Sequence, residues 1–169
     1  SFYFVGTHVS RPTFTDTDVE VDCIDSAGVR CWSFGSAGVS YNPFDLGGAG
    51  HHDEIPFRIT YFANALYVVG ATDVGVSTVD YAAFTFKLDA STGLGVPEFG
   101  NESSVLGLFT ANYNTPGTGS DVFYDVVAYA PSAGSLRVVM VGDITQADGY
   151  PLGIVRSLDG QTAAADFFI

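Results

Sequence analysis

The sequence predicts an all-β fold made of repeated four-stranded antiparallel units. Landmarks return along the 169-residue chain at intervals of about 65 to 70 residues, and no stretch keeps a helical period. Twenty Gly and seven Pro separate segments rich in Val, Thr, Tyr and Phe, as expected of short strands joined by turns. The hydrophobic share of 47% excludes a disordered chain.

The repeat is visible in two apolar landmarks. The segment Tyr-Phe-Val-Gly at 3–6 returns as Tyr-Val-Val-Gly at 67–70 and as Val-Met-Val-Gly at 139–142. A Phe-Gly pair at 34–35 returns at 99–100, and the third copy lacks it. Such a period indicates one supersecondary unit that is used several times.

A third landmark is an acidic turn. Asp25, Asp89 and Asp159 recur at equivalent places, each followed within a few residues by Gly, Ser or Thr. An Asp in this position most often caps a turn by accepting hydrogen bonds from backbone N–H groups. We therefore predict a structural role for the three, since a catalytic residue is needed only once.

Each unit contains strand-like segments in a fixed order. In Val19–Ile24 apolar and acidic residues alternate, and Phe84, Phe86 and Leu88 share one face. The predicted strands are 2–6, 19–24 and 38–46 in a unit of residues 1–50; 54–62, 66–70, 81–88 and 105–111 in a unit of residues 51–115; and 121–129, 136–142, 150–158 and 165–169 in a unit of residues 116–169. The first unit lacks the first of its four strands.

Four short antiparallel strands per repeat are typical of a β-propeller blade. The residues Val68–Ala71, Asp80–Asp89 and Pro97–Gly100 resemble the delta-60-type repeats of bacterial β-propellers, which read as a "vvaG" strand, an "aRlnaDG" strand and turn, and "sFG". The resemblance spans nearly the whole chain in three imperfect copies. It implies a propeller-like fold and no particular function.

Three units are fewer than the four to eight blades of a closed propeller. The strand edge beside residues 2–6 would also be open and apolar. Three arrangements would account for the small number of units and the open edge. The chain is part of a longer propeller, or several copies assemble with each donating a strand to its neighbour, or the units form a β-sandwich with jelly-roll-like packing.

The charge narrows the classes of partner. The formal net charge is −13, with one Lys among six basic residues, so neither nucleic acid nor an anionic membrane finds a basic patch. No apolar run reaches about 18 residues, so we expect no membrane span. An acidic, Lys-poor surface favours an extracellular or cell-surface protein and the binding of cations.

Cys23 and Cys31 are the two cysteines, and the segment between them contains a turn signal. A hairpin there would bring the sulfurs within bonding range, and the spacing fits no zinc motif. We predict a disulfide, with free thiols as the alternative; a disulfide implies an oxidising compartment.

An acidic ladder is the candidate metal site. Alternation places Asp18, Glu20 and Asp22 on one face of a strand, where like charges repel and a cation would relieve them. Calcium, with oxygen ligands, is the cofactor that this site would take, and a solvated acidic face is the alternative.

Other candidates are weaker. His51-His52-Asp53-Glu54 is the densest group of potential ligands, but neighbours on a strand point to opposite faces, which favours a polar loop. Asn101 begins an Asn-Glu-Ser glycosylation sequon. No Gly-x-Ser-x-Gly elbow is present, and no residue is selected as catalytic.

The leading functional hypothesis is a non-enzymatic, extracellular structural or adhesive protein, such as a subunit of a surface layer or filament that self-associates through strand sharing. A calcium- or carbohydrate-binding module of a larger secreted protein is the second hypothesis. A fragment of a secreted hydrolase or lyase is the third.

Overall fold

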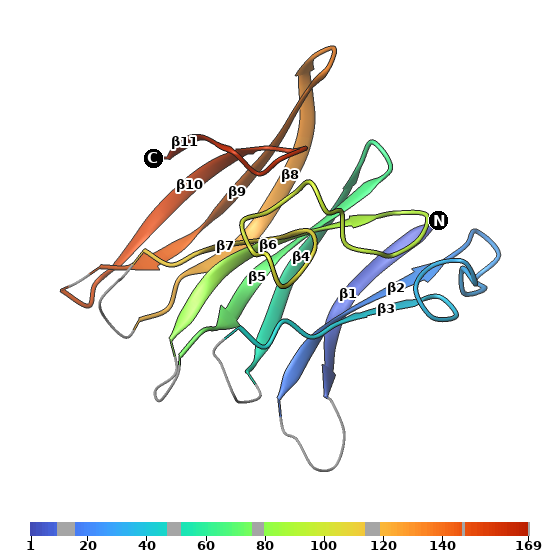
Figure 1. Cartoon of the computed structure of the whole chain (residues 1–169), viewed down its shortest axis with the longest axis horizontal. Coiled ribbons are helices and arrows are strands. Elements are labelled where there is room, and N and C mark those ends of the chain that lie inside the picture. The colour runs from blue at the N-terminus through green and yellow to red at the C-terminus, as the bar shows by residue number, and fades with distance from the viewer. Residues whose placement is uncertain (10–15, 47–51, 76–79, 114–118, 147, 169) are drawn as a thin grey trace.

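The computed structural model describes residues 1–9, 16–46, 52–75, 80–113, 119–146 and 148–168, and within these ranges the regular elements are eleven β-strands and no helix. The strands form three antiparallel sheets that follow one another across the molecule (Figure 1). The first sheet contains β1 (Phe2–Val9), β2 (Thr17–Ile24) and β3 (Val39–Asn42). The middle sheet contains β4 (Glu54–Phe62), β5 (Ala65–Asp73), β6 (Tyr81–Asp89) and β7 (Leu108–Ala111). The third sheet contains β8 (Val122–Ser132), β9 (Ser135–Thr145), β10 (Pro151–Asp159) and β11 (Ala165–Phe168).

Each sheet is a meander, in which every strand pairs with the next one along the chain. The tightest connections are the hairpins from β4 to β5 and from β8 to β9. In the first of these Ala63 and Asn64 both have positive φ, which matches the strand twist of a two-residue hairpin. All-β architecture and antiparallel pairing are therefore confirmed, and the described strands do not close into a barrel or a ring.

The predicted strands agree with those observed except in length. The second and third strands extend past their apolar segments because cross-strand pairing continues through polar residues, as at His8↔Asp18. The fourth strands of the first two units are shorter than predicted. Pro43, which has no N–H to donate, follows the end of β3. Gly107, at φ +85, precedes β7, and a Cβ there would lie 2.4 Å from the Lys87 carbonyl oxygen.

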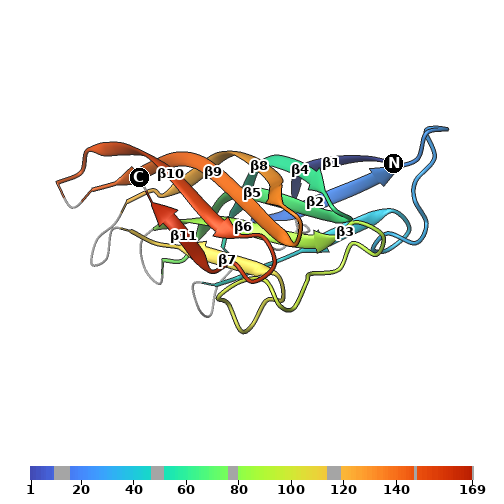
Figure 2. The ribbon, with the colours of Figure 1, turned by 90° about the horizontal axis from the view of Figure 1, so that it is seen from above.

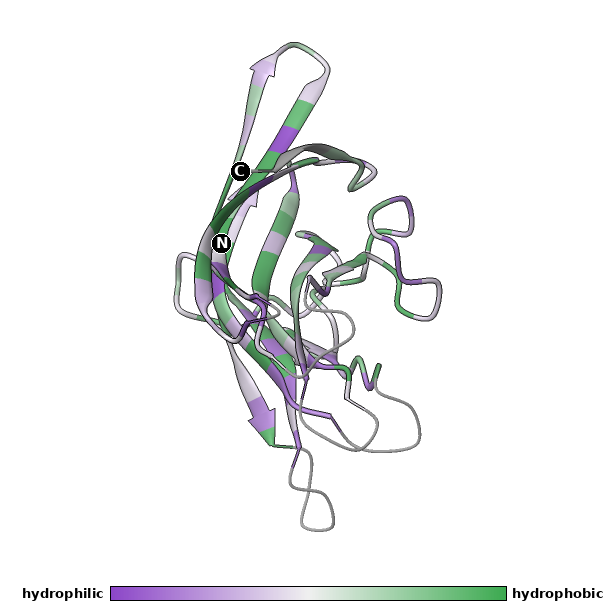
Figure 3. Ribbon diagram, turned by 90° about the vertical axis from the view of Figure 1, so that its left-hand side faces the viewer, coloured by the Kyte–Doolittle hydropathy of each residue, from purple (hydrophilic) through white to green (hydrophobic). Residues whose placement is uncertain are grey.

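The middle sheet lies between the other two (Figure 2). One face of β5 and β6 packs against the first sheet and the opposite face packs against the third, so both strands are buried almost throughout. Figure 3 shows hydrophobic residues, in green, along the strands of the molecule. A strand covered on both faces is expected to be continuously apolar rather than alternating, which explains the uniform run from Leu66 to Val69.

Two hydrophobic cores result. The core between the first and middle sheets is built on Val19, Val21, Cys23, Phe34, Phe44, Leu66, Val68, Phe84, Phe86, Leu88, Ala90 and Leu108. The core between the middle and third sheets is built on Ala65, Tyr67, Val69, Ala83, Phe99, Phe109, Phe123, Val126, Ala128, Val138, Met140, Ile144, Ile154, Leu158 and Ala163.

A tyrosine joins each sheet to the next in the same way. The ring of Tyr3 lies 5.6 Å from that of Phe34, and its hydroxyl donates to the Ala90 carbonyl oxygen at 2.8 Å. Sixty-four residues later, Tyr67 lies 5.9 Å from Phe99 and donates to the Gly160 carbonyl oxygen at 2.8 Å. We call each of these arrangements a tyrosine clasp.

The third sheet differs at the tyrosine position of the repeat, where it carries Val139. In both clasps the ring of the tyrosine packs on the phenylalanine of the same unit.

The disulfide predicted from the sequence is present. Cys23 at the end of β2 bonds to Cys31, with a Cα–Cα distance of 5.4 Å. The backbone already brings the two residues together, since the Cys31 N–H donates to the Cys23 carbonyl oxygen at 2.9 Å.

Candidate functional site

The outer edge of β1 is the feature that distinguishes the first sheet. In the middle and third sheets a first strand, β4 or β8, pairs with the second strand. Among the described residues no strand pairs with the corresponding edge of β1. Its backbone N–H and C=O groups on that side are therefore open to another chain.

A glycine marks where the absent strand would pass. At Gly70 a Cβ would lie 2.1 Å from the carbonyl oxygen of Ile55 in β4, and at Gly142 it would lie 1.9 Å from that of Val122 in β8. Only glycine allows so close an approach of two backbones. Gly6 occupies the same repeat position on β1, yet nothing lies within 4 Å of a Cβ built there. Gly6 is thus present on β1 although, among the described residues, β1 has no neighbouring strand of the kind that requires a glycine in β5 and β9.

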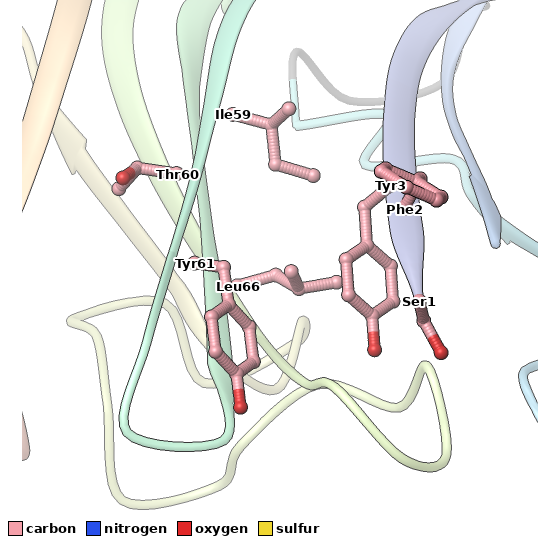
Figure 4. Close-up of a pocket in the computed structure, with 7 residues that line it drawn as sticks. All are labelled: Ser1, Phe2, Tyr3, Ile59, Thr60, Tyr61 and Leu66. Atoms are coloured by element: carbon pink, nitrogen blue, oxygen red, sulfur yellow. The ribbon is translucent and has the colours of Figure 1, made fainter. Parts of the chain in front are cut away.

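A cavity of about 460 Å³ opens beside this edge. Figure 4 shows Ile59 pointing from β4 toward β1, whereas Thr60 points away. Tyr3 and Tyr61 stack at 6.0 Å between their ring centroids. Apolar side chains and an unpaired backbone therefore face the same space. The lining residues are Ser1, Phe2, Tyr3, Ile59, Thr60, Tyr61 and Leu66.

Large apolar side chains of β1 are exposed on its other side. Phe2 and Phe4 are 61% and 54% exposed, although Leu66 and Val68, at the same repeat positions in β5, are fully buried. An exposed apolar edge strand of this kind is a site for association with another chain.

The neighbouring first strands show how such a strand is held. Both β4 and β8 contain a bulge, between Pro56 and Arg58 and between Phe123 and Asp125. The aromatic residues at the two bulges, Phe57 and Tyr124, contact edge to face at 5.4 Å.

The next position of each strand carries a charge. The Arg58 Nε lies 3.1 Å from an Asp125 carboxylate oxygen, and both side chains are more than half exposed. The first strands β4 and β8 therefore contact each other at equivalent repeat positions, through one aromatic pair and one ion pair.

The acidic ladder lies on the outer face of the first sheet, and each carboxylate has a different partner. The hydroxyl of Tyr41 donates to Asp18, which is buried. Glu20 lies 2.8 Å from His8 Nδ1, and Asp22 lies 3.5 Å from Arg30.

Within the described ranges, no three His, Cys, Asp or Glu side chains lie together as a metal site would require. Calcium binding by Asp18, Glu20 and Asp22 stays a prediction. A rise in melting temperature at millimolar calcium would support it, and an unchanged temperature would remove it.

The histidine–acid segment before β4 enters the protein interior. His51 lies outside the described residues. Asp53 accepts hydrogen bonds from the N–H and hydroxyl of Thr17, at 2.8 and 2.9 Å. His52 and Glu54 are buried, with His52 Nδ1 3.5 Å from Asp73.

Glu54 is the most perturbed of these groups. Its carboxylate accepts from the Phe44 N–H at 3.3 Å and from the Thr72 hydroxyl at 3.2 Å. Burial raises the pKa of Glu54 to about 8, and the negative charges of Asp18 and Asp45 add to the increase. The hydrogen bonds from Phe44 and Thr72 act in the opposite direction and lower the pKa.

The recurrent aspartates accept backbone hydrogen bonds in all three turns. The Asp25 carboxylate accepts from Ala27 and Val29 at 2.8 and 2.9 Å. Asp89 accepts from Ser91 and Thr92, and Asp159 from Gln161 and Thr162, at 2.9 to 3.0 Å. The Ser91 hydroxyl and these N–H groups hold the pKa of Asp89 below its usual value.

Asn101 is exposed, but its side chain is engaged. Its Nδ2 donates to the Thr110 carbonyl oxygen at 2.9 Å, and its oxygen accepts from the Thr110 N–H at 2.8 Å. The nitrogen that would carry a glycan therefore joins the loop to β7. Glycosylation of Asn101 stays a prediction.

No family model, curated protein or solved structure matches the chain. Within the described residues, no helix has the length and apolar character needed to cross a membrane.

The sequence alone did not single out Gly6, Ile59 or the Phe57–Arg58 pair as parts of a site. The available signal was the repeat itself. Aligning β4 with β8 places Phe57 on Tyr124 and Arg58 on Asp125, an aromatic followed by a charge of opposite sign. Only the structure shows that these equal positions touch.

Proposed function

We propose that this chain is a non-enzymatic, extracellular structural or adhesive protein, built from β-propeller-like repeats, which self-associates by strand sharing into an extended or ring-shaped assembly. The observation that carries the proposal is the unpaired edge of β1 with Gly6 open beside it. A sheet that lacks one strand, in a chain whose other sheets have it, is completed by a strand from elsewhere.

The arrangement of the sheets supports the proposed propeller-like architecture. Successive meanders stack face on face, and each tyrosine clasp reaches from one sheet to the same place on the next. Such nearest-neighbour contacts are typical of repeat proteins, in which one interface is used several times.

The disulfide and the surface charge support an extracellular location. Disulfides such as Cys23–Cys31 persist in oxidising compartments. A net charge of −13 keeps an assembling protein soluble until specific contacts form.

Light scattering with negative-stain imaging tests the proposal. We expect wild-type chains to form oligomers or filaments. The Gly6→Val variant should remain monomeric and folded, because no described atom lies within 4 Å of a Cβ at Gly6, whereas the side chain would block an incoming strand. Gly153→Val, also in a strand with no heavy atom nearer than 3.9 Å, is the matched control and should assemble normally. A wild-type monomer at all accessible concentrations would refute self-assembly.

A further inference from the structure

We infer that the groove between β1 and β4 selects an extended segment with an aromatic residue followed by an acidic one, which pairs with β1 and places those two side chains on Phe57 and Arg58. This inference rests on the proposed function, because it names the kind of strand that completes the first sheet. The segment would come from a second copy of this chain.

The register follows from the two complete sheets. Ile59 pairs with Val68 in the middle sheet, and Val126 pairs with Met140 in the third. Phe4 is the residue of β1 at this repeat position, so the equivalent residue of the incoming strand lies opposite Phe4. The bulge that follows Pro56 and Phe123 then lies beside Gly6.

The aromatic preference follows from the contact between the first strands. Phe57 is 46% exposed although one of its neighbours, Tyr124, is in place. The incoming strand would be the first strand of the first sheet, so it would lie beside β4 in the way that β4 lies beside β8. Its bulge residue therefore meets Phe57 as Phe57 meets Tyr124, and an aromatic ring there covers the exposed surface.

The acidic preference follows from charge. The residue after the bulge in the incoming strand meets Arg58, as Arg58 meets Asp125. An arginine at that position would set two guanidinium groups against each other. An aspartate or glutamate would instead place a second carboxylate beside Arg58, whose side chain remains 60% exposed.

Of the chain's own first strands, β8 carries the acidic Asp125 after its bulge and β4 carries the basic Arg58. The probe is therefore a fluorescently labelled peptide with the sequence of residues 121–132, compared with the same peptide carrying Asp125→Arg. Both are titrated with the full chain at low concentration and followed by fluorescence anisotropy.

We expect the acidic peptide to bind about five- to tenfold more tightly than the basic one, as an exposed pair changes from attraction to repulsion. The chain variant Arg58→Glu should reverse this order. Arg30→Glu, whose side chain is 59% exposed and pairs with Asp22, is the matched control and should leave it unchanged. Gly6→Val should abolish binding of both peptides.

Backbone pairing has its own test. Peptides N-methylated at alternate residues, in two complementary sets, each lose the hydrogen-bond donors of one edge. One set should bind and the other should not, because only one edge faces β1. Equal binding of the acidic and basic peptides, binding that survives Gly6→Val, or no binding at millimolar peptide would each overturn the inference.

The two proposals fail differently. Chains that polymerise but bind no peptide would overturn this inference and leave self-assembly standing through another surface. Chains that stay monomeric but discriminate between the peptides would support the sequence preference of the groove and refute a second copy as the source of the strand.

Discussion

The middle sheet and the first sheet share one repeat but differ in what covers them. Phe84 and Phe86 of β6 are buried against the first sheet. Sixty-four positions earlier, β2 carries Glu20 and Asp22 on its outer face, where no sheet of the described chain lies. At these two positions, β2 carries acidic residues where no sheet of the described chain packs, and β6 carries phenylalanines where a sheet does.

The two strands β1 and β2 of the first sheet differ on this face. β2 carries Glu20 and Asp22, whereas β1 carries the exposed Phe2 and Phe4, since Phe4 pairs with Asp22. The first sheet thus combines acidic residues on its second strand with exposed aromatic residues on its first, next to the edge where nothing lies within 4 Å of a Cβ at Gly6.

The largest effect should come from comparing alanine substitutions at one repeat position, which is buried in the middle sheet and exposed in the first. Phe84→Ala should lower the free energy of unfolding by about 3–5 kcal/mol, because it opens a cavity beside Phe44, whose ring lies 5.3 Å away. Glu20→Ala should cost less than about 1 kcal/mol, since it removes only a half-exposed pair with His8. Urea unfolding measures both, and similar losses would contradict the comparison.

The disulfide is the second difference between the two sheets. Lys87 and Gly95 occupy the cysteine positions in the middle sheet. Replacing Cys23 and Cys31 by Ala should cost about 2.5 kcal/mol, from the loop entropy regained by the unfolded chain. Chemical unfolding with and without reductant measures it. The double variant should be insensitive to reductant, and a stability unchanged from wild type would contradict the prediction.

Buried and exposed carboxylates give the third test. The pKa of Glu54 is raised from 4.5 to about 8, so the stability that its neutral form supplies is fully present below about pH 4.5 and is lost as the pH rises through 8. Glu54→Gln keeps a neutral group at every pH and should stabilise the protein by a few kcal/mol at pH 9, with the gain growing as the pH rises from 4.5 to 8. Melting curves across pH measure this difference.

Glu20→Gln is the matched control for the same measurement. Glu20 is half-exposed and lies beside His8, so this variant should show no gain at pH 9. A Glu54→Gln profile parallel to the wild-type profile would show that the carboxyl group does not titrate across this range.

The smallest effects should come from the tyrosine clasps. Tyr3→Phe and Tyr67→Phe should each cost about 1 kcal/mol, the net value of one hydrogen bond. Tyr67→Phe should be the milder of the two, because Lys87 Nζ also donates to the Gly160 carbonyl oxygen, at 2.7 Å. Differential scanning calorimetry can compare them, and a larger loss at Tyr67 would assign its hydroxyl a further role.

Much of the fold could be predicted because alternation, turn residues and the repeat act locally. The strand positions, the disulfide and the shared face of Asp18, Glu20 and Asp22 all follow from nearby residues. The burial of Glu54 could not be predicted in this way, because it depends on Phe44 and Thr72 from other elements. The open edge was predicted, but its groove was not, since Ile59 and Tyr61 reach it only through the stacking of the sheets.

The clasps also set an order of events during synthesis. Tyr3 finds its acceptor in Ala90, 87 residues later, and Tyr67 finds its acceptor in Gly160, 93 residues later. At about 5–20 residues per second, the ribosome leaves the first clasp without its acceptor for roughly 4–17 seconds. Until the middle sheet emerges, the inner face of the first sheet, with Val19 and Val21, has no partner in the core that it later shares with Phe84 and Phe86. The Cys23–Cys31 bond joins partners only eight residues apart, so its formation requires none of the later strands.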